Sequence, residues 1–138
     1  MTTDSTPAVL FLCVHNAGRS QMARGWFDHL ARGRARAFSG GSEPAPMVNP
    51  AAVAVMAEVG IDISAQQPQR WTDAMLAGTN VVITMGCGDA CPIVPGVRYE
   101  DWELPDPAGL DIEAVRPIRD EIGRRVRDLL GRLGVPTS

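Results

Sequence analysis

The stretch AVLFLCVHNAGRSQMARGWF, residues 8–27, decides the fold. It opens with the continuous apolar run Ala8–Leu12, which is typical of a parallel strand that is covered on both faces. Beyond a short loop, apolar side chains recur at helical spacing and predict a helix that begins near Ser20 and ends near Gly33. The stretch therefore predicts a strand, a loop and a helix in direct succession.

Further strands and helices are predicted along the rest of the chain. The strand candidates are residues 35–40 (ARAFSG), 80–85 (NVVITM) and 97–102 (VRYEDW). Asn49 as N-cap, Pro50 at the first helical position and Gly60 as terminator predict a helix between them. A short helix is expected to begin near Thr72, and a long one with an apolar face covers residues 111–133. This alternation predicts the α/β class: a single-domain, open, parallel four-stranded sheet with helices on both faces.

We expect one domain over residues 8–134, preceded by a disordered leader over residues 1–7. The 138 residues are enough to bury a core without disulfides or metals. A net charge of -3 gives no sign of nucleic acid as a partner, and no apolar run approaches the ~20 residues of a membrane span. The first residues lack a signal-peptide pattern, so a cytoplasmic location is expected. Three cysteines, an odd number, favour reduced and reactive thiols over a disulfide framework.

The loop CVHNAGRS, residues 13–20, has the composition of an oxyanion site. A strand that turns into a helix points backbone N–H groups, and the positive end of the helix dipole, at one spot. The residues expected to bind a tetrahedral anion there are Val14, His15, Asn16, Ala17, Gly18 and Arg19. The same surroundings favour the thiolate of Cys13, and Ser20 can donate a hydrogen bond to its sulfur. Cys13 is therefore a candidate nucleophile; the alternative is that it is a small apolar filler.

The pattern C-x5-R-S in a small α/β domain resembles the low-molecular-weight tyrosine phosphatase superfamily. The segments SQMARGW, VNPAAVAVMAEVGIDIS, ITMGC, DPAG and RDEI resemble its arsenate reductase branch, of the thioredoxin-coupled, three-cysteine type. The resemblance extends from about Val9 to Leu133 and implies an enzyme that reduces arsenate to arsenite. It also implies that Asp106 is the general acid that protonates the departing oxygen, with Asp101 and Glu103 as fallback candidates.

Cys87 and Cys91 lie in the sequence CGDAC, after a predicted buried strand. No third and fourth ligand lie nearby in the sequence, so no metal site is predicted. From the residues alone, the two thiols either form a disulfide or are inert. The resemblance implies a cascade in which Cys13 forms an arsenic adduct, Cys87 attacks it to release arsenite, and Cys91 resolves the disulfide. Thioredoxin is then the external reductant, and no bound cofactor is expected.

Two positions depart from the pattern of the relatives. Many thioredoxin-coupled relatives carry a cysteine before the loop arginine, where this chain has Gly18, and that position is not expected to take part in the cascade. Some relatives bind potassium with the loop asparagine and a glutamate of the next helix, and that glutamate position is Arg24 here. Because a guanidinium repels a cation and can itself brace the loop, we predict no potassium site.

Other functions stay open at this point. A phosphatase for phosphotyrosine shares the nucleophile, but such enzymes carry aromatic residues after the Asp-Pro pair, where this chain has Ala108 and Gly109. A mycothiol-dependent arsenate transferase would not need Cys87 and Cys91. A non-catalytic oxyanion sensor would not need a nucleophile, an acid and a thiol pair together. The shared loop also predicts a weak phosphatase side activity for a reductase.

Overall fold

The computed structural model describes residues 6–86 and 97–137. Its elements in chain order are β1 (Ala8–Cys13), α1 (Arg19–Ala31), β2 (Arg36–Gly41), α2 (Pro50–Glu58), α3 (Asp73–Ala77), β3 (Val81–Thr84), β4 (Arg98–Asp101) and α4 (Ile112–Arg132). Each of these elements was predicted, with ends that differ by one or two residues. The predicted leader, residues 1–7, lies outside the described residues apart from its last two positions.

The four strands form one sheet in the order β2, β1, β3, β4, and each neighbouring pair is parallel. This arrangement confirms the predicted fold class. β1 lies between β2 and β3, and its last residue, Cys13, is opposite Gly41 of β2. Because the strands are parallel, the loops that follow them emerge at the same edge of the sheet.

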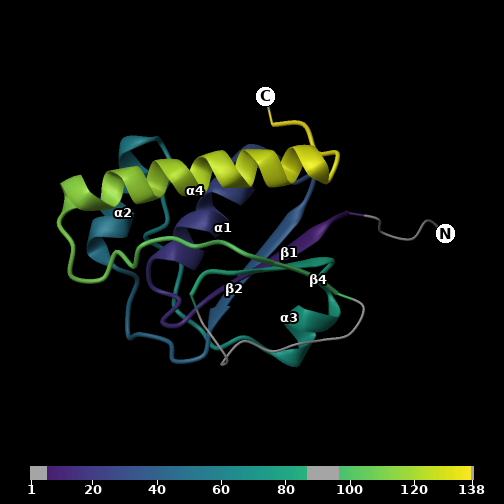
Figure 1. The fold of residues 1–138 in the computed structure, drawn as a ribbon, viewed down its shortest axis with the longest axis horizontal. Helices are drawn as coiled ribbons and strands as arrows, with labels where there is room; N and C mark the ends of the chain where they lie inside the picture. Colours follow the sequence, from purple (N-terminus) through teal and green to yellow (C-terminus); the bar gives the residue numbers. More distant parts are fainter. Residues whose placement is uncertain (1–5, 87–96, 138) are drawn as a thin grey trace.

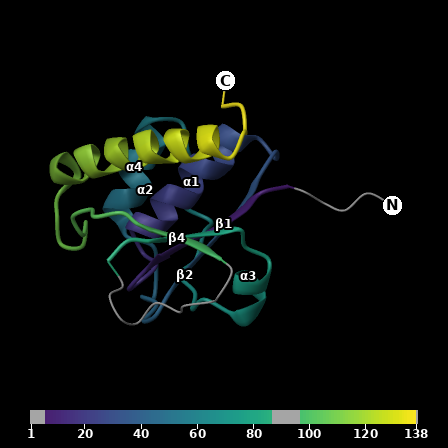
Figure 2. The ribbon, with the colours of Figure 1, turned by 45° about the vertical axis from the view of Figure 1, so that its right-hand side comes forward.

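Alternate residues of β1 face opposite sides of the sheet. Val9 and Phe11 pack into the cluster formed by α1, α2 and α4, whereas Leu10 and Leu12 pack with Leu76 of α3. Figures 1 and 2 show the same division, with α1, α2 and α4 on one side of the sheet and α3 on the other. Cover on both faces explains why β1 is apolar throughout. Within the described ranges, no helix has the length and apolar character needed to cross a membrane.

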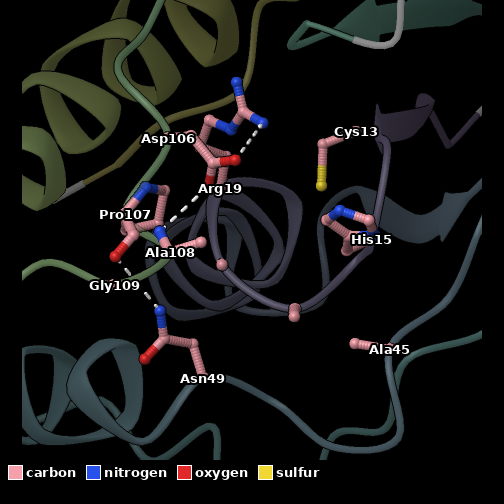
Figure 3. Close-up of a pocket in the computed structure, with 11 residues that line it drawn as sticks. Cys13, His15, Arg19, Ala45, Asn49, Asp106, Pro107, Ala108 and Gly109 are labelled. Carbon is pink, nitrogen blue, oxygen red and sulfur yellow. Dashed lines mark hydrogen bonds and ion pairs between the residues drawn. The ribbon is translucent and has the colours of Figure 1, made fainter.

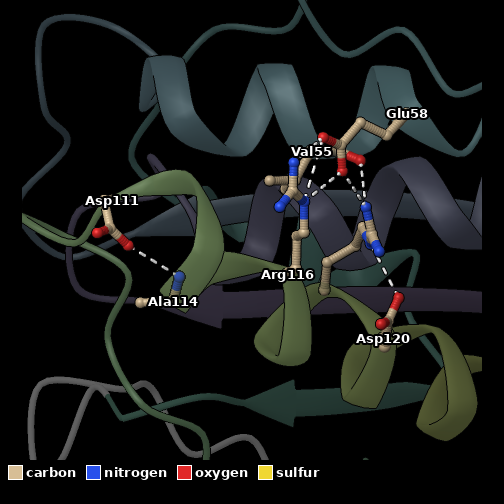
Figure 4. Close-up of polar contacts among 7 residues, drawn as sticks. Val55, Glu58, Asp111, Ala114, Arg116 and Asp120 are labelled. Carbon is tan, nitrogen blue, oxygen red and sulfur yellow. Dashed lines mark hydrogen bonds and ion pairs between the residues drawn. The ribbon is translucent and has the colours of Figure 1, made fainter.

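Helix α4 is joined to α2 by a group of charged side chains (Figure 4) that we call the α2–α4 ion-pair cluster: Glu58, Arg116 and Arg119. Arg119 Nη1 donates to Val55 O at 2.9 Å and to Glu58 Oε1 at 2.8 Å. Arg116 Nη2 donates to Glu58 Oε2 at 2.7 Å. The hydrogen bonds from Arg116, and to a smaller extent from Arg119, lower the pKa of Glu58 to about 2.

Helix α4 also lies close against α1. A Cβ atom added to Gly123 would be 2.7 Å from Cε2 of Trp26, so only a glycine leaves room for the indole ring there. The indole Nε1 of Trp26 donates to the carbonyl oxygen of Arg119 at 3.1 Å. These contacts fix the second half of α1 against α4.

Candidate active site

A cavity of about 260 Å³ opens where β1 ends. It is lined by Cys13, His15, Ala17, Gly18, Arg19, Ala45, Asn49, Asp106, Pro107, Ala108 and Gly109. Figure 3 shows Cys13 and His15 on one side of this space and residues 106–109 across from them, with Arg19 beside Asp106. The fold therefore brings the loop between β1 and α1 opposite a segment about ninety residues further along the chain.

The anion loop, residues 14–18, has its carbonyl oxygens tied to the segment that follows β2. The bonds are Glu43 N to Val14 O at 2.9 Å, Ala45 N to His15 O at 3.0 Å and Asn49 N to Ala17 O at 2.8 Å. From His15 to Ser20, no backbone N–H donates to an acceptor within the described residues. These amides and the N-terminus of the 13-residue α1 lie together at the cavity, in an arrangement that suits an anion.

The candidate nucleophile lies at the end of β1, with 2% of its surface exposed. Cys13 Sγ is 2.8 Å from Ser20 Oγ. Asn16 Nδ2 donates to the same Ser20 Oγ at 2.6 Å, which leaves the hydroxyl proton of Ser20 available to the sulfur. Asn16 adopts a φ of 49°, and the side chains of both Asn16 and Ser20 are fully buried. The Ser20 hydroxyl is therefore placed to donate a hydrogen bond to the sulfur of Cys13.

Arg19, the first residue of α1, extends along the rim of the cavity. Its Nη1 donates to Leu104 O at 3.3 Å, and its Nη2 lies 3.6 Å from Asp106 Oδ2. A Cβ atom on Gly86 would be 2.6 Å from Arg19 Nη1, and Gly86 has a φ of +89°. A side chain at position 86 would therefore displace the guanidinium. Both contacts of Arg19 are long, so its fork has hydrogen-bonding capacity left for an anion.

Asp106 is the only one of the three candidate acids that lines the cavity. Its side chain is 51% exposed, and its Oδ1 accepts a hydrogen bond from Ala108 N at 3.0 Å. Asp101 instead accepts a bond from Thr84 Oγ1 at 2.7 Å, and Glu103 lines a separate apolar cavity. Proximity to the anion loop therefore favours Asp106 over both fallback candidates.

Gly18 allows the segment that carries Asp106 to rest directly on the anion loop. A Cβ atom at this position would lie 2.5 Å from Cγ of Pro107. The cysteine that many relatives carry here would meet the same proline ring. Glycine at position 18, where many relatives have cysteine, therefore leaves room for Pro107 to pack against the anion loop.

Not every residue expected to bind the anion has a side chain in the cavity. The side chain of Val14 packs with Leu10 and Leu12 on the α3 side of the sheet. That of Asn16 is buried beneath the loop, where it reaches Ser20. His15 lines the cavity, and its Nδ1 is 3.0 Å from Glu43 O. In Val14 and Asn16, only the backbone is therefore placed to contact a molecule in the cavity.

The two remaining cysteines of the predicted site, Cys87 and Cys91, lie outside the described residues. Cys13 is a free thiol.

Asn49 belongs to the site in a way that the sequence did not indicate. It was predicted only as a helix cap, and its Oδ1 does accept a bond from Ala51 N at 2.9 Å. Its own N–H also holds the anion loop at Ala17 O, and its Nδ2 donates to Pro107 O at 3.4 Å. The capping pattern is local, and no spacing signal marks a contact between residues so far apart.

Arg24 does not brace the anion loop as expected. Its Nε lies 3.7 Å from Asp28 Oδ2 in the same helix, and it makes no hydrogen bond to the loop within the described residues. Over residues 6–86 and 97–137, no group of three or more histidine, cysteine, aspartate or glutamate side chains is arranged to hold a metal ion.

Comparison with known proteins places these features in context. Residues 8–136 match the family model described as low molecular weight phosphotyrosine protein phosphatase. The glutaredoxin arsenate reductase of Synechocystis sp. is 38% identical over 128 residues, which cover 91% of this chain and 97% of that protein. An arsenate reductase of Bacillus subtilis is 40% identical over 130 residues, which cover 87% and 92%. The structure of a thioredoxin-dependent arsenate reductase of Corynebacterium glutamicum matches with a TM-score of 0.84 and 40% identity; the match covers 96% of this chain and 64% of that one.

Proposed function

The chain belongs to the low molecular weight phosphotyrosine protein phosphatase family and is similar to its arsenate reductases, and from this premise we propose that it reduces arsenate to arsenite. The observation that carries the proposal is one small cavity with Cys13, Arg19 and Asp106 around it, beside loop amides that have no acceptor among the described residues. This set supplies a nucleophile, an oxyanion receptor and an acid.

The lining of the cavity favours a small inorganic anion over phosphotyrosine. Among the described residues, the lining contains no phenylalanine, tyrosine or tryptophan, and Ala108 and Gly109 follow the Asp106–Pro107 pair. A phenyl ring would therefore find no aromatic side chain to stack on, whereas a tetrahedral oxyanion needs only the amides and Arg19. Hydrolysis of an activated aryl phosphate remains expected as a weak side activity.

The first chemical step is attack on arsenic. The thiolate of Cys13 forms a sulfur–arsenic bond while one arsenic–oxygen bond breaks, and the departing oxygen takes a proton from Asp106 and leaves as water. Arg19 and the loop amides hold the remaining oxygens as negative charge shifts among them. The contact of 3.6 Å between Arg19 and Asp106 keeps the acid beside the anion.

The reduction follows from two disulfide exchanges. The thiolate of Cys87 attacks the sulfur of Cys13, so a disulfide forms and arsenic departs with the bonding electron pair as arsenite. The thiolate of Cys91 then attacks Cys87, which frees Cys13 and leaves a Cys87–Cys91 disulfide. Thioredoxin reduces this disulfide, and no bound cofactor is required. We place the reaction in the cytoplasm, where thiols are kept reduced.

We further propose that the reductant of the Cys87–Cys91 disulfide is thioredoxin. Among the similar proteins, one is named for glutaredoxin and another for thioredoxin, so similarity alone does not distinguish the two. The alternative route uses mycothiol and a glutaredoxin-like protein, and it needs neither Cys87 nor Cys91. The presence of both thiols therefore favours thioredoxin.

The proposal is tested by arsenate turnover with thioredoxin, thioredoxin reductase and NADPH. We expect sustained turnover in the wild type and none in Cys13→Ser. Cys87→Ser should form the adduct without releasing arsenite, and Cys91→Ser should stop after a single turnover. Sustained turnover in Cys91→Ser would contradict the three-cysteine cascade.

Two controls accompany this experiment. Hydrolysis of p-nitrophenyl phosphate should need Cys13, Arg19 and Asp106 but neither of the other cysteines, so it shows that Cys87→Ser and Cys91→Ser are folded. Replacing thioredoxin by mycothiol and a glutaredoxin-like protein tests the transferase alternative, which predicts full activity in Cys87→Ser.

A further inference from the structure

A group of amide side chains lies beneath the anion loop and is not part of the cavity lining. Gln21, in the first turn of α1, is fully buried. Its Nε2 donates to Asn16 O at 2.8 Å, to Asn16 Oδ1 at 3.0 Å and to Gln67 O at 3.1 Å. Three oxygen atoms, two of them from the anion loop, therefore converge on a single amide nitrogen.

The orientation of the Gln21 amide is determined by a second glutamine. Gln66 Nε2 donates to Gln21 Oε1 at 2.6 Å, so the opposite end of the Gln21 amide must carry the N–H groups. With its Oδ1 accepting from Gln21, the side chain of Asn16 directs its Nδ2 to Ser20 Oγ, and Ser20 Oγ contacts Cys13 Sγ. One chain of hydrogen bonds thus runs from the half-buried Gln66 to the nucleophile.

The residues here do not fit the potassium ion that some relatives hold beside this loop. A cation needs acceptor oxygens with free lone pairs, and Asn16 Oδ1 already accepts from Gln21 Nε2 and from Gln69 N at 2.9 Å. Arg24, a positively charged side chain, lines a surface pocket together with residues 65–69. No carboxylate among the described residues bonds to this group of amides.

We propose that Gln21 is a positioning residue whose amide nitrogen holds the converging oxygens of Asn16 and Gln67, so that the anion loop keeps its shape without a monovalent cation. The proposal rests on the proposed function only for the identity of the anion. The same chain of amide hydrogen bonds also places Ser20 against Cys13, so a change at Gln21 should alter both anion binding and the surroundings of the Cys13 sulfur.

The decisive variant is Gln21→Glu, which replaces the donor by a carboxylate oxygen of the same shape. Four oxygens would then converge in a buried space, and only a proton or a cation can hold them together. Gln21→Met is the neutral variant of similar size that removes the donor. Ala65→Glu is the control for charge, because it adds an exposed carboxylate to the neighbouring segment.

The probe is inorganic phosphate, with its dissociation constant measured by calorimetry in choline, sodium and potassium chloride at equal ionic strength. We expect the wild type and Ala65→Glu to bind equally in all three salts. Gln21→Met should bind about tenfold more weakly in each salt, as expected for a lost buried hydrogen-bond donor. Gln21→Glu should bind at least as weakly in choline and recover about tenfold in sodium or potassium.

Two results would overturn the proposal. One is stronger phosphate binding by the wild type in potassium than in choline. The other is a Gln21→Glu variant with no dependence on the cation. If the Gln21 variants fail to fold, Gln66→Leu takes their place, since it leaves the Gln21 amide free to flip and should weaken binding about threefold. Phosphate binding needs no arsenate turnover, so this test can succeed where the proposed function fails.

Discussion

Two buried arginines of this molecule have the same exposure and different surroundings. Arg19 at the anion loop and Arg119 in the α2–α4 ion-pair cluster each expose 8% of their surface. Arg119 donates to Val55 O, Glu58 and Asp120 at 2.8 to 2.9 Å. Within residues 6–86 and 97–137, Arg19 has one hydrogen bond of 3.3 Å and one ion pair of 3.6 Å. Among these residues, the contacts of Arg119 are therefore shorter and more numerous than those of Arg19.

The same contrast extends to the backbone around them. The loop amides from His15 to Ser20 have no acceptor within the described residues, and the loop residues His15 and Ala17 are not buried. Amides at the edge of an open cavity are accessible to the oxygens of an anion. Burial alone therefore does not distinguish the two arginines, whereas their hydrogen bonds with the described residues do.

The largest expected effect is a loss of catalytic rate when Asp106, but not the nearby Asp101, is replaced. Asp106→Asn keeps the shape of the side chain and the acceptor for Ala108 N but cannot supply a proton. We expect the rate of p-nitrophenyl phosphate hydrolysis to fall about a thousandfold. Asp101→Asn, whose carboxylate bonds to Thr84 away from the cavity, should retain nearly all activity. Equal losses in the two variants would mean that the acid is wrongly assigned.

The next effect tests whether the position of Arg19 depends on Gly86. Gly86→Ala places a Cβ atom against Arg19 Nη1 at a φ that alanine rarely adopts. We expect kcat/KM for arsenate to fall about a hundredfold. Gly60→Ala is the matched control, since Gly60 has a φ of +81° with no atom within 4 Å of the added Cβ. It should lose stability to a similar extent and keep its activity.

A third prediction addresses the core between α1 and α4. Because this region is closely packed and lies away from the cavity, a substitution there should lower stability without changing the catalytic rate. Gly123→Ala forces a methyl group against Trp26, and we expect it to reduce the free energy of unfolding by about 2 kcal/mol. Gly131→Ala lies in the same helix with open space around it, so it should be neutral or stabilising. Urea unfolding measures the stability of both variants. A loss of activity per folded molecule in Gly123→Ala would show that this part of the core also affects catalysis.

The smallest effect concerns the pH dependence of the ion-pair cluster. Because Arg116 lowers the pKa of Glu58 from 4.5 to about 2, the folded state holds the Glu58 carboxylate more strongly than the unfolded state does. Its contribution to stability is therefore fully present above pH 4.5 and is lost as the pH falls toward 2. Glu58→Gln should be less stable than the wild type at pH 7, with the difference shrinking in unfolding experiments below pH 4.5. A difference that does not change with pH would exclude the ionised pair as its cause.

Much of the fold was predictable because its signals are short in range. The apolar run of β1, the N-cap at Asn49 and the apolar face of α4 each lie within a few residues of the structure they specify. The anion loop was predictable for the same reason, since Cys13, Arg19 and Ser20 share one strand-to-helix junction. The family resemblance added the role of Asp106, which an isolated Asp-Pro pair would not indicate.

By itself, the sequence determined the order of strands and helices and the composition of the anion loop, because periodicity and local turn chemistry act between near neighbours. Only the tertiary structure showed that Asp106 lies at the cavity while Asp101 and Glu103 do not, why Gly18 and Gly86 have no side chain, and which bonds Gln21 and Asn49 make to the loop. Those features depend on contacts between distant segments, such as the bond from Asn49 to Pro107. Distances of this kind exist only once the sheet has brought its loops to one edge.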